Sequence, residues 1–403
     1  MSFNVLSQPL SRLVQNMNES ATLKMSQLSR DLRAQGFDII NLSIGEPDFV
    51  TPAHIREAAK KALDEGYTKY TPVPGLVEFR EAIAEKFRRD NGLDFNINQI
   101  VVSNGAKQSI ANLALALLDE GDEAILFAPY WVSYYEIVRM AGGVPVPVLA
   151  GVDQDYKVTP EQVSAAITER TKFVLFSSPC NPTGSVYSHG ELEAIAAVIA
   201  PHEQIIIISD EIYEYINFAG HHTSIGTLPA VKDRTVTVNG FAKGFAMTGW
   251  RLGYMGAPEY LAKACTKIQG QFTSGASAFG QKAAADALRA DMAPTWEMRE
   301  AFHNRRDFCH GLLSQIPGFK VPLPEGAFYF FPDISAWFGT ANGDTQIRNA
   351  DDFCEYLLHE AHVATVSGRA FGADNCFRLS YAASEEELRR AIDRIATAVG
   401  KLK

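Results

Sequence analysis

The assignment of the fold rests on one stretch of sequence, Thr235-Val-Thr-Val-Asn-Gly-Phe-Ala-Lys-Gly-Phe-Ala-Met-Thr-Gly-Trp-Arg-Leu-Gly-Tyr254. Its β-branched start predicts a buried strand, and Lys243 follows among small residues at the mouth of that strand. A partly desolvated lysine can lose its proton and attack a carbonyl to form an imine. Arg251 is a planar fork suited to a phosphate. Taken alone, however, a lysine on a Gly-rich loop is more often simply solvated.

Helices and short apolar strands alternate on both sides of this stretch, from about residue 50 to about residue 290. The predicted strands cover residues 99–103, 123–127, 172–178, 204–209, 234–238 and 252–257. Nearly continuous Val, Ile, Leu and Phe in such strands indicate a mostly parallel sheet covered on both faces. Thr51 is expected to cap the first helix of this region, with Pro52 at its first position.

The pattern changes beyond about residue 295. A long helix over 296–313 precedes the apolar run 327–331, a helix over 351–361, two short strands and a closing helix. Ser384 and Glu387 are spaced as a capping box for that last helix. We therefore predict three parts: an N-terminal segment, 1–50, that contributes to the small domain, a large domain, 51–294, and a small α+β domain, 295–403.

Composition restricts the class of protein. A chain of 403 residues exceeds what one core usually supports, and 46% hydrophobic against 21% charged residues argues against disorder. The net charge of -10 disfavours a nucleic-acid partner, and the apolar runs are too short to span a membrane. Five cysteines without paired spacing fit neither a disulfide framework nor a zinc site. With no secretory signal visible, we expect a soluble cytoplasmic protein without a bound metal.

Polar residues collect just after the predicted strands. In an open parallel sheet, ligands bind beyond the carboxyl ends of the strands. The residues found there are Gly105, Ala106, Lys107, Trp131, Asn181, Asp210, Tyr213 and Lys243. Each has an ordinary structural explanation: an aspartate such as Asp210 is commonly a helix N-cap, and Asn181 lies in a turn sequence.

Their combination is more informative than any member. A helix start for a phosphate, an aromatic plane, an amide, a carboxylate, a phenol, a lysine and an arginine emerge at one edge of one sheet. Pyridoxal 5'-phosphate requires this set, because a carboxylate keeps its pyridine nitrogen protonated, donors bind its phenolic oxygen and a lysine forms an imine with it. We therefore predict a site for this cofactor.

On these motifs the chain resembles the class I aminotransferases with the PLP-dependent aspartate aminotransferase fold. The resemblance runs from Gly45-Glu-Pro-Asp-Phe49 to Phe377-Arg-Leu-Ser-Tyr381, and it points to the bacterial subgroup, some of whose members also accept prephenate or aromatic substrates. It implies an α/β fold in which the large domain contains a mostly parallel seven-stranded sheet, with a smaller α+β domain beside it.

The resemblance also implies roles for the residues that bind the cofactor. Lys243 would be the internal aldimine lysine and the base that moves the proton between Cα and C4'. Asp210 would pair with the pyridinium nitrogen, and Asn181 and Tyr213 would hydrogen-bond the phenolic oxygen. Trp131 would stack on the ring. The phosphate would be held by Arg251 and the backbone of Gly105, Ala106 and Lys107.

Further roles concern the substrate and a second subunit. Tyr70 resembles the tyrosine that reaches the partner subunit's phosphate, which implies a C2 homodimer. Arg378 would take the substrate α-carboxylate as a bidentate pair, and Gly45 would offer its backbone to the same group. Trp131 and Asn181 would contact the substrate as well.

Two departures from the family pattern affect these expectations. Gly240 stands where many members have a hydroxyl that touches the phosphate. Residues 267–274 lack the arginine that animal-type enzymes use for the distal carboxylate of the substrate. Lys107, helped by hydroxyls such as that of Thr22, would replace it, and a point charge tolerates more than one carboxylate geometry.

The expected activity is transfer of the amino group of L-aspartate to 2-oxoglutarate, giving oxaloacetate and L-glutamate by a ping-pong mechanism. Prephenate, aromatic or alanine transamination on the same fold stays open, as does a β-lyase reaction. A nucleotide-binding protein is disfavoured because neither G-x-G-x-x-G after a strand nor G-x-x-x-x-G-K-[ST] occurs. A DNA-binding regulator is disfavoured because no helix-turn-helix or basic extension accompanies the domain.

Overall fold

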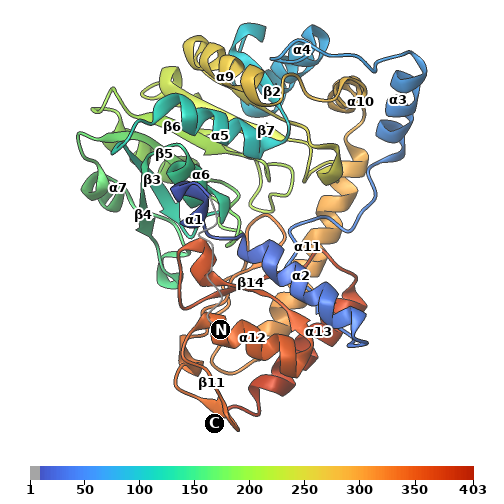
Figure 1. The fold of residues 1–403 in the computed structure, drawn as a ribbon, viewed down its shortest axis with the longest axis vertical. Helices are drawn as coiled ribbons and strands as arrows, with labels where there is room; N and C mark the ends of the chain where they lie inside the picture. The colour runs from blue at the N-terminus through green and yellow to red at the C-terminus, as the bar shows by residue number, and fades with distance from the viewer. Residues whose placement is uncertain (1–9) are drawn as a thin grey trace, which may run out of the picture.

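The computed structural model describes residues 10–403, and a seven-stranded sheet forms the centre of its larger lobe (Figure 1). The strands are β2 (Ile100–Ser103), β3 (Glu123–Ala128), β4 (Val144–Leu149), β5 (Thr171–Ser177), β6 (Ile206–Asp210), β7 (Thr235–Gly240) and β8 (Gly253–Gly256). Their order is β2-β8-β7-β6-β5-β3-β4. Six of these strands run in the same direction, and β8 runs in the opposite direction. The mostly parallel seven-stranded sheet is thereby confirmed.

Helices cover both faces of the sheet, which explains why its interior strands are buried on both sides. One face carries α5 (Ala106–Leu117), α6 (Ser133–Met140) and α9 (Glu259–Phe272). The other carries α3 (Ala53–Asp64), α4 (Val77–Lys86), α7 (Pro160–Ala166), α8 (His189–Ile199) and α10 (Ala278–Arg289). Along β6, Ile206 and Ile208 pack on the first face and Ile207 on the second. This alternation is the period of two expected of a strand.

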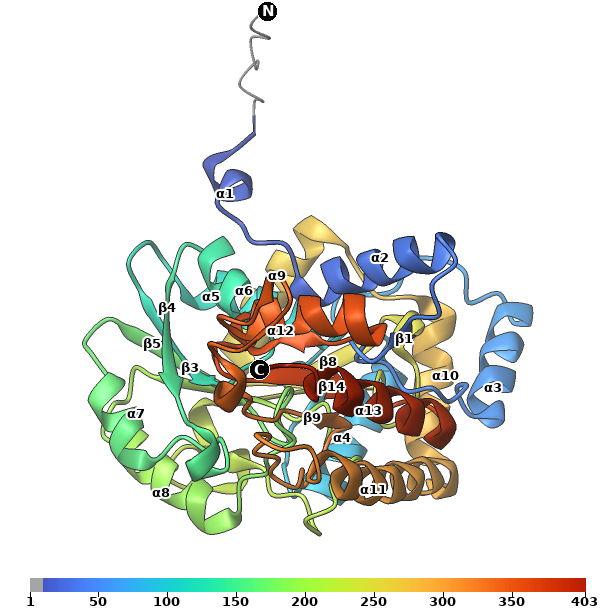
Figure 2. The ribbon, with the colours of Figure 1, turned by 90° about the horizontal axis from the view of Figure 1, so that it is seen from below.

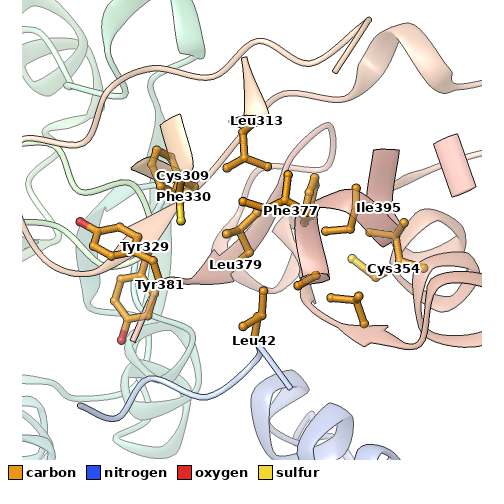
Figure 3. Packing of buried hydrophobic residues seen from close by; sticks show 14 of the residues in the cluster. Leu42, Cys309, Leu313, Tyr329, Phe330, Cys354, Phe377, Leu379, Tyr381 and Ile395 are labelled. Atoms are coloured by element: carbon orange, nitrogen blue, oxygen red, sulfur yellow. The ribbon is translucent and has the colours of Figure 1, made fainter. Parts of the chain in front are cut away.

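A smaller lobe follows the long helix α11 (Ala293–Leu313), which runs beside both lobes (Figure 1). Its main sheet has the order β13-β14-β9, all antiparallel. The remaining elements are β9 (Tyr329–Phe330), β10 (Ala341–Asn342), β11 (Thr345–Gln346), α12 (Ala350–Tyr356), β12 (Val363–Ala364), β13 (Val366–Ser367), β14 (Phe377–Ser380) and α13 (Glu385–Val399). Buried side chains from α11, α12, α13 and this sheet form one core, in which Phe377 and Leu379 are central (Figure 3).

The N-terminal segment joins this smaller lobe. It contains α1 (Arg12–Gln15), α2 (Ala21–Ala34) and β1 (Ile40–Asn41), and β1 pairs with β12 in parallel. Figure 2 shows α2 near α12 on one side of β14, with α11 on the other side. The division at residues 50 and 294 stays a prediction, since a boundary is not fixed by these contacts.

The structure also corrects two local expectations. The sequence reading missed β4, whose run Val-Pro-Val-Pro-Val-Leu contains Pro145 and Pro147. Proline is tolerated there because β4 is an edge strand that pairs only with β3. Thr51 does not cap α3: Pro52 occupies the cap position, and the Thr51 hydroxyl donates to Ala246 O at 2.7 Å.

The expected cap of the last helix is present, in that Ser384 accepts a hydrogen bond from the Glu387 N–H. Among the helices of residues 10–403, none is both long enough and apolar enough to cross a membrane.

Candidate active site

The sheet brings the candidate residues to one edge. The segments after β2, β3, β5, β6 and β7 lie there because these strands run in the same direction. Arg251 reaches the same edge because it precedes β8, which runs in the opposite direction. A cavity of about 390 Å³ opens at this edge. Its wall includes Thr22, Gly45, Gly105, Ala106, Lys107, Trp131, Asn181, Asp210, Tyr213, Lys243, Arg251 and Arg378.

Lys243 follows β7 and is held in an environment that disfavours its charge. Its Nζ donates to Gly45 O at 2.5 Å and lies 5.7 Å from the ring centroid of Tyr213. Burial lowers the pKa of Lys243 to about 8, and the positive charge of Arg378 contributes in the same direction. A lysine of this kind supplies a nucleophilic amine near neutral pH.

Asp210, the last residue of β6, is a buried carboxylate with two hydrogen-bond donors. Tyr134 donates its hydroxyl to Oδ2 at 2.6 Å, and the Ile212 N–H donates to Oδ1 at 3.2 Å. Burial raises the pKa of Asp210 to about 6, while these two hydrogen bonds oppose the rise. At neutral pH the carboxylate is therefore ionised and able to pair with a cationic ring nitrogen.

The part of the cavity wall formed by Arg251 and the start of α5 is suited to a phosphate. Ala106 begins α5, whose free N–H groups and dipole favour an anion. The Arg251 guanidinium lies against Gly105, where a Cβ would come within 2.5 Å of Nη2. Gly105 has φ +85°, a backbone conformation that favours glycine, and a side chain there would displace the Arg251 guanidinium.

Arg378 is contributed by β14 of the smaller lobe and is 2% exposed. Its Nη1 donates to Asn181 Oδ1 at 2.9 Å, and its Nη2 donates to Ser43 O at 2.6 Å. The guanidinium carbon lies 4.4 Å from the Tyr329 ring centroid. This arrangement fixes a planar cation at the cavity wall, where a carboxylate can be bound.

Lys107 and Thr22, the residues predicted to bind the distal carboxylate of the substrate, both line the cavity. The Lys107 ammonium lies 4.8 Å from the centroid of the Trp131 ring. Desolvation lowers the pKa of Lys107, and the nearby Arg251 adds to this effect. Thr22 reaches the same wall from α2.

Tyr70 is the exception. It does not line the cavity, and it is 99% exposed. In the single chain it therefore contacts neither Lys243 nor Arg251.

The absence of a hydroxyl at position 240 has a steric explanation. A Cβ at Gly240 would lie 2.9 Å from Leu252 O and 3.0 Å from Gly253 Cα. A serine or threonine would require the two strands β7 and β8 to move apart. The backbone of this chain thus leaves no room for a side chain with a hydroxyl at this position.

Two tyrosines of the site, Tyr134 and Tyr329, were not among the residues predicted from the sequence. Tyr134 bonds Asp210 and packs edge-on against Trp131, and Tyr329 shares a 2.7 Å hydrogen bond with Tyr213. Tyr134 follows Trp131 at helical spacing and was a detectable candidate. Tyr329 lies in the apolar run 327–331, and nothing in that run indicates contact with the larger lobe.

Comparison with known proteins assigns the family. The chain matches the family described as Aminotransferase class I and II over residues 38–395. It is 46% identical over 399 residues to a bifunctional aspartate aminotransferase and glutamate/aspartate-prephenate aminotransferase of Petunia hybrida, covering 98% of this chain and 83% of that protein. It is 46% identical to an aspartate aminotransferase of Geobacillus stearothermophilus, covering 96% and 98%. The chain belongs to the class I and II aminotransferases.

Solved structures agree with this assignment. The aspartate aminotransferase from Rhizobium meliloti superposes with a TM-score of 0.95 at 40% identity, covering 98% of this chain and all of that one (100%). The aspartate aminotransferase from Thermus thermophilus with maleate superposes with a TM-score of 0.91 at 44% identity, covering 97% and 100%. The fold of this chain is that of the aspartate aminotransferases, and the protein is a transaminase.

Proposed function

We propose that this protein uses pyridoxal 5'-phosphate to transfer the amino group of L-aspartate to 2-oxoglutarate, giving oxaloacetate and L-glutamate. The observation that carries the proposal is the position of Lys243, Asp210 and Arg378 on the wall of one cavity. The relatives that are called aspartate aminotransferases support the choice of substrate.

The residues present fit the cofactor. Arg251 and the start of α5 offer a phosphate site at one end of the cavity, and buried Asp210 offers a carboxylate for the ring nitrogen. When bound, pyridoxal 5'-phosphate supplies an aldehyde that captures the amino group and a ring that withdraws electrons from the substrate Cα. Trp131 offers a plane for that ring, and Asn181 and Tyr213 offer donors for its phenolic oxygen.

Side chains and backbone groups of the protein would transfer the proton and orient the substrate. Lys243, with a pKa of about 8, can give up its proton near neutral pH and act as the base at the substrate Cα. Arg378, supported by Asn181 and Ser43, orients the substrate through its α-carboxylate. Gly45 lies beside Lys243 on the loop before α3 and offers backbone groups to the same carboxylate.

The distal carboxylate of aspartate is assigned to Lys107 and Thr22. Both residues line the cavity, and the pKa of Lys107 is lowered by its surroundings. A lysine accepts several carboxylate geometries, whereas an arginine fork selects one. Acceptance of prephenate is therefore the second candidate function, and it is favoured by relatives such as the aspartate/prephenate aminotransferase of Cereibacter sphaeroides, 45% identical to this chain.

A homodimer in the cytoplasm is part of the proposal. Tyr70 is a nearly fully exposed aromatic residue, as expected of a side chain whose role lies in a partner subunit. In the dimer its hydroxyl would donate to the cofactor phosphate of the partner subunit. The division into residues 1–50, 51–294 and 295–403 also belongs to the proposal, with β1 supporting the first assignment through its pairing with β12.

The test is the visible absorption spectrum of the purified protein. We expect a yellow protein whose band converts to that of the amine form of the cofactor when L-aspartate is added. Restoration of the first band by 2-oxoglutarate completes the proposed cycle. Oxaloacetate and prephenate are then compared as amino-group acceptors. If prephenate restored the first band as well as oxaloacetate did, we would conclude that the protein also acts on prephenate. A colourless protein that takes up no added pyridoxal 5'-phosphate would refute the proposal.

A further inference from the structure

A second group of buried polar residues lies next to Asp210, outside the candidate active site. We call it the Glu211 cluster, and it consists of Lys86, Asn91, Glu211, Glu214 and His222. Each of these side chains is at most 9% exposed, and none of them lines the cavity described above. Burial of four ionisable groups is costly unless they are paired. Such a cluster beside the candidate active site therefore requires an explanation.

Hydrogen bonds connect the members of the cluster, and Asn91 Nδ2, 3.4 Å from Glu211 Oε2, joins the part around Glu211 to the part around Glu214. His222 Nε2 lies 2.9 Å from Glu211 Oε2, and Ser224 donates its hydroxyl to Oε1 at 2.7 Å. Asn91 donates to Glu214 Oε2 at 2.7 Å and accepts from Lys86 Nζ at 2.6 Å. These bonds tie the loop after β6 to α4 and to the turn that follows it.

Asp210 and Glu211 point to opposite sides of the sheet. Asp210 continues the face of Ile206 and Ile208 and lines the cavity, whereas Glu211 bonds to the Ser209 hydroxyl at 2.9 Å on the other side. Tyr213, three residues beyond Asp210, returns to the cavity. Two residues that face the proposed cofactor thus flank the anchor of the cluster.

The charges of the cluster cancel when His222 is protonated. Glu211 and Glu214 are then balanced by Lys86 and His222, while the neighbouring carboxylate of Asp90, which also acts on Lys86, is paired with Arg89. Burial alone would lower the pKa of His222, but the two carboxylates outweigh it and raise that pKa. Glu211, Glu214 and His222 also have the spacing of metal ligands, yet the Lys86 ammonium already contacts Glu214 and supplies positive charge there.

We propose that Glu211 and His222 are positioning residues for the proposed reaction. Their pair holds the segment that carries Asp210 and Tyr213, and the positive charge of His222 offsets Glu211 so that Asp210 stays ionised opposite the cofactor. The proposal rests on the proposed binding of pyridoxal 5'-phosphate.

The physical reason is the proximity of two carboxylates in a poorly solvated region. The pKa of Asp210 is raised chiefly by burial, and the negative charge of Glu211 raises it further. Lys243 acts in the opposite direction, as does the hydrogen bond from Tyr134. If the positive charge of His222 is lost, the negative charge of Glu211 is no longer offset and the pKa of Asp210 should rise. If the charge of Glu211 is lost, the pKa of Asp210 should fall.

Two substitutions therefore have opposite expected effects. The affinity of the cofactor-free full-length protein for pyridoxal 5'-phosphate is measured by equilibrium dialysis between pH 5 and pH 9, with every variant in a Lys243→Ala background so that titration of Lys243 does not contribute, and the pH below which affinity begins to fall is recorded. His222→Gln keeps a hydrogen-bond donor but loses the charge, so this pH should rise by on the order of one unit. Glu211→Gln should lower it.

Glu123→Gln is the matched control. Glu123 is also buried and bonded to Thr168 and Arg170, but it begins β3 at the opposite edge of the same sheet. The control should leave the measured pH unchanged.

Shifts of the same sign in both variants, or no shift in either, would overturn the proposal. If Glu211→Gln does not fold, an unshifted His222→Gln suffices to overturn it. If the parent protein binds no pyridoxal 5'-phosphate, the proposed function itself fails, which is a distinct result.

Discussion

The protonation state of Lys243 sets the rate of its proposed reaction with an aldehyde. Only the proton-free amine is a nucleophile. Because burial lowers the pKa of Lys243 to about 8, the proton-free fraction rises with pH and saturates above that value. The rate of capture of pyridoxal 5'-phosphate, followed by stopped-flow absorbance, should therefore be half-maximal near pH 8 and level off about one pH unit higher.

A rate that still rises near pH 10 would show that Lys243 titrates like an ordinary lysine, whose pKa is 10.5. The control is Lys243→Ala, which keeps Asp210 and Arg251. It should bind the cofactor reversibly, without the covalent absorbance change, and should lose transamination.

Lys107 is expected to discriminate between substrates. If its ammonium pairs with the distal carboxylate, Lys107→Ala should raise the KM for aspartate about tenfold, the usual cost of a hydrogen bond to a charged group. The KM for phenylalanine, which has no distal carboxylate, should change little. Steady-state kinetics with both substrates measure the difference, and Lys263→Ala on the exposed face of α9 is the control. Equal effects on both substrates would remove Lys107 from the account of specificity.

The sequence could predict those site residues whose position follows from a strand end. Asp210 ends its strand, and Lys243 and Asn181 follow within a few residues of theirs, so sheet geometry brings them to the same edge. Tyr329 could not be predicted, because its contact with Tyr213 depends on how the two lobes pack. The 2.9 Å bond from Arg378 to Asn181 spans 197 positions in the chain, and here the family resemblance rather than any local pattern indicated the site.

At the scale of elements, the attachment of α4 to the loop after β6 depends on the buried contact between Lys86 and Glu214. Lys86 is 0% exposed. Lys86→Met removes one partner and leaves a buried carboxylate uncompensated, which should reduce the free energy of unfolding by about 3–5 kcal/mol. Urea denaturation followed by circular dichroism measures this change.

A surface pair on the same helix serves as the comparison. Arg289 of α10 pairs with Glu85 of α4, and both side chains are about half exposed. Arg289→Met should cost less than about 1 kcal/mol, because solvent screens such pairs. An equally small effect of Lys86→Met would mean that the buried contact does not hold α4 to the loop.

Helices and strands could be predicted where the hydrophobic pattern and the conformational preferences of the residues indicated the same element. The interior strands β5, β6 and β7 are buried on both sides and were located to within about two residues, the usual error of such boundaries. The edge strand β4 contains Pro145 and Pro147, which ordinarily argue against a strand. Because β4 pairs only with β3, the missing N–H groups of the two prolines leave no second neighbour without a hydrogen bond. The position of β4 at the edge of the sheet is visible only in the assembled structure.

At the scale of the whole molecule, the proposed active site is shared between subunits. Lys243 lies in the cavity of its own chain, while the exposed Tyr70 is assigned to the cavity of the partner. Tyr70→Phe should weaken binding of pyridoxal 5'-phosphate about tenfold or more, by loss of a hydrogen bond to a charged phosphate. At limiting cofactor, this variant and Lys243→Ala should each be poorly active when alone.

Mixing the two variants distinguishes a shared site from a separate one. In a hybrid C2 dimer, one cavity combines an intact Lys243 with an intact Tyr70 from the other subunit, and the second cavity has neither. Random reassociation makes half of the dimers hybrid, so about a quarter of the parent activity should return. If Tyr70 served its own chain, each cavity of the hybrid would lack one of the two residues and mixing would restore nothing. Co-refolding the variants and assaying aspartate transamination therefore tests the dimer and the assignment of Tyr70 together.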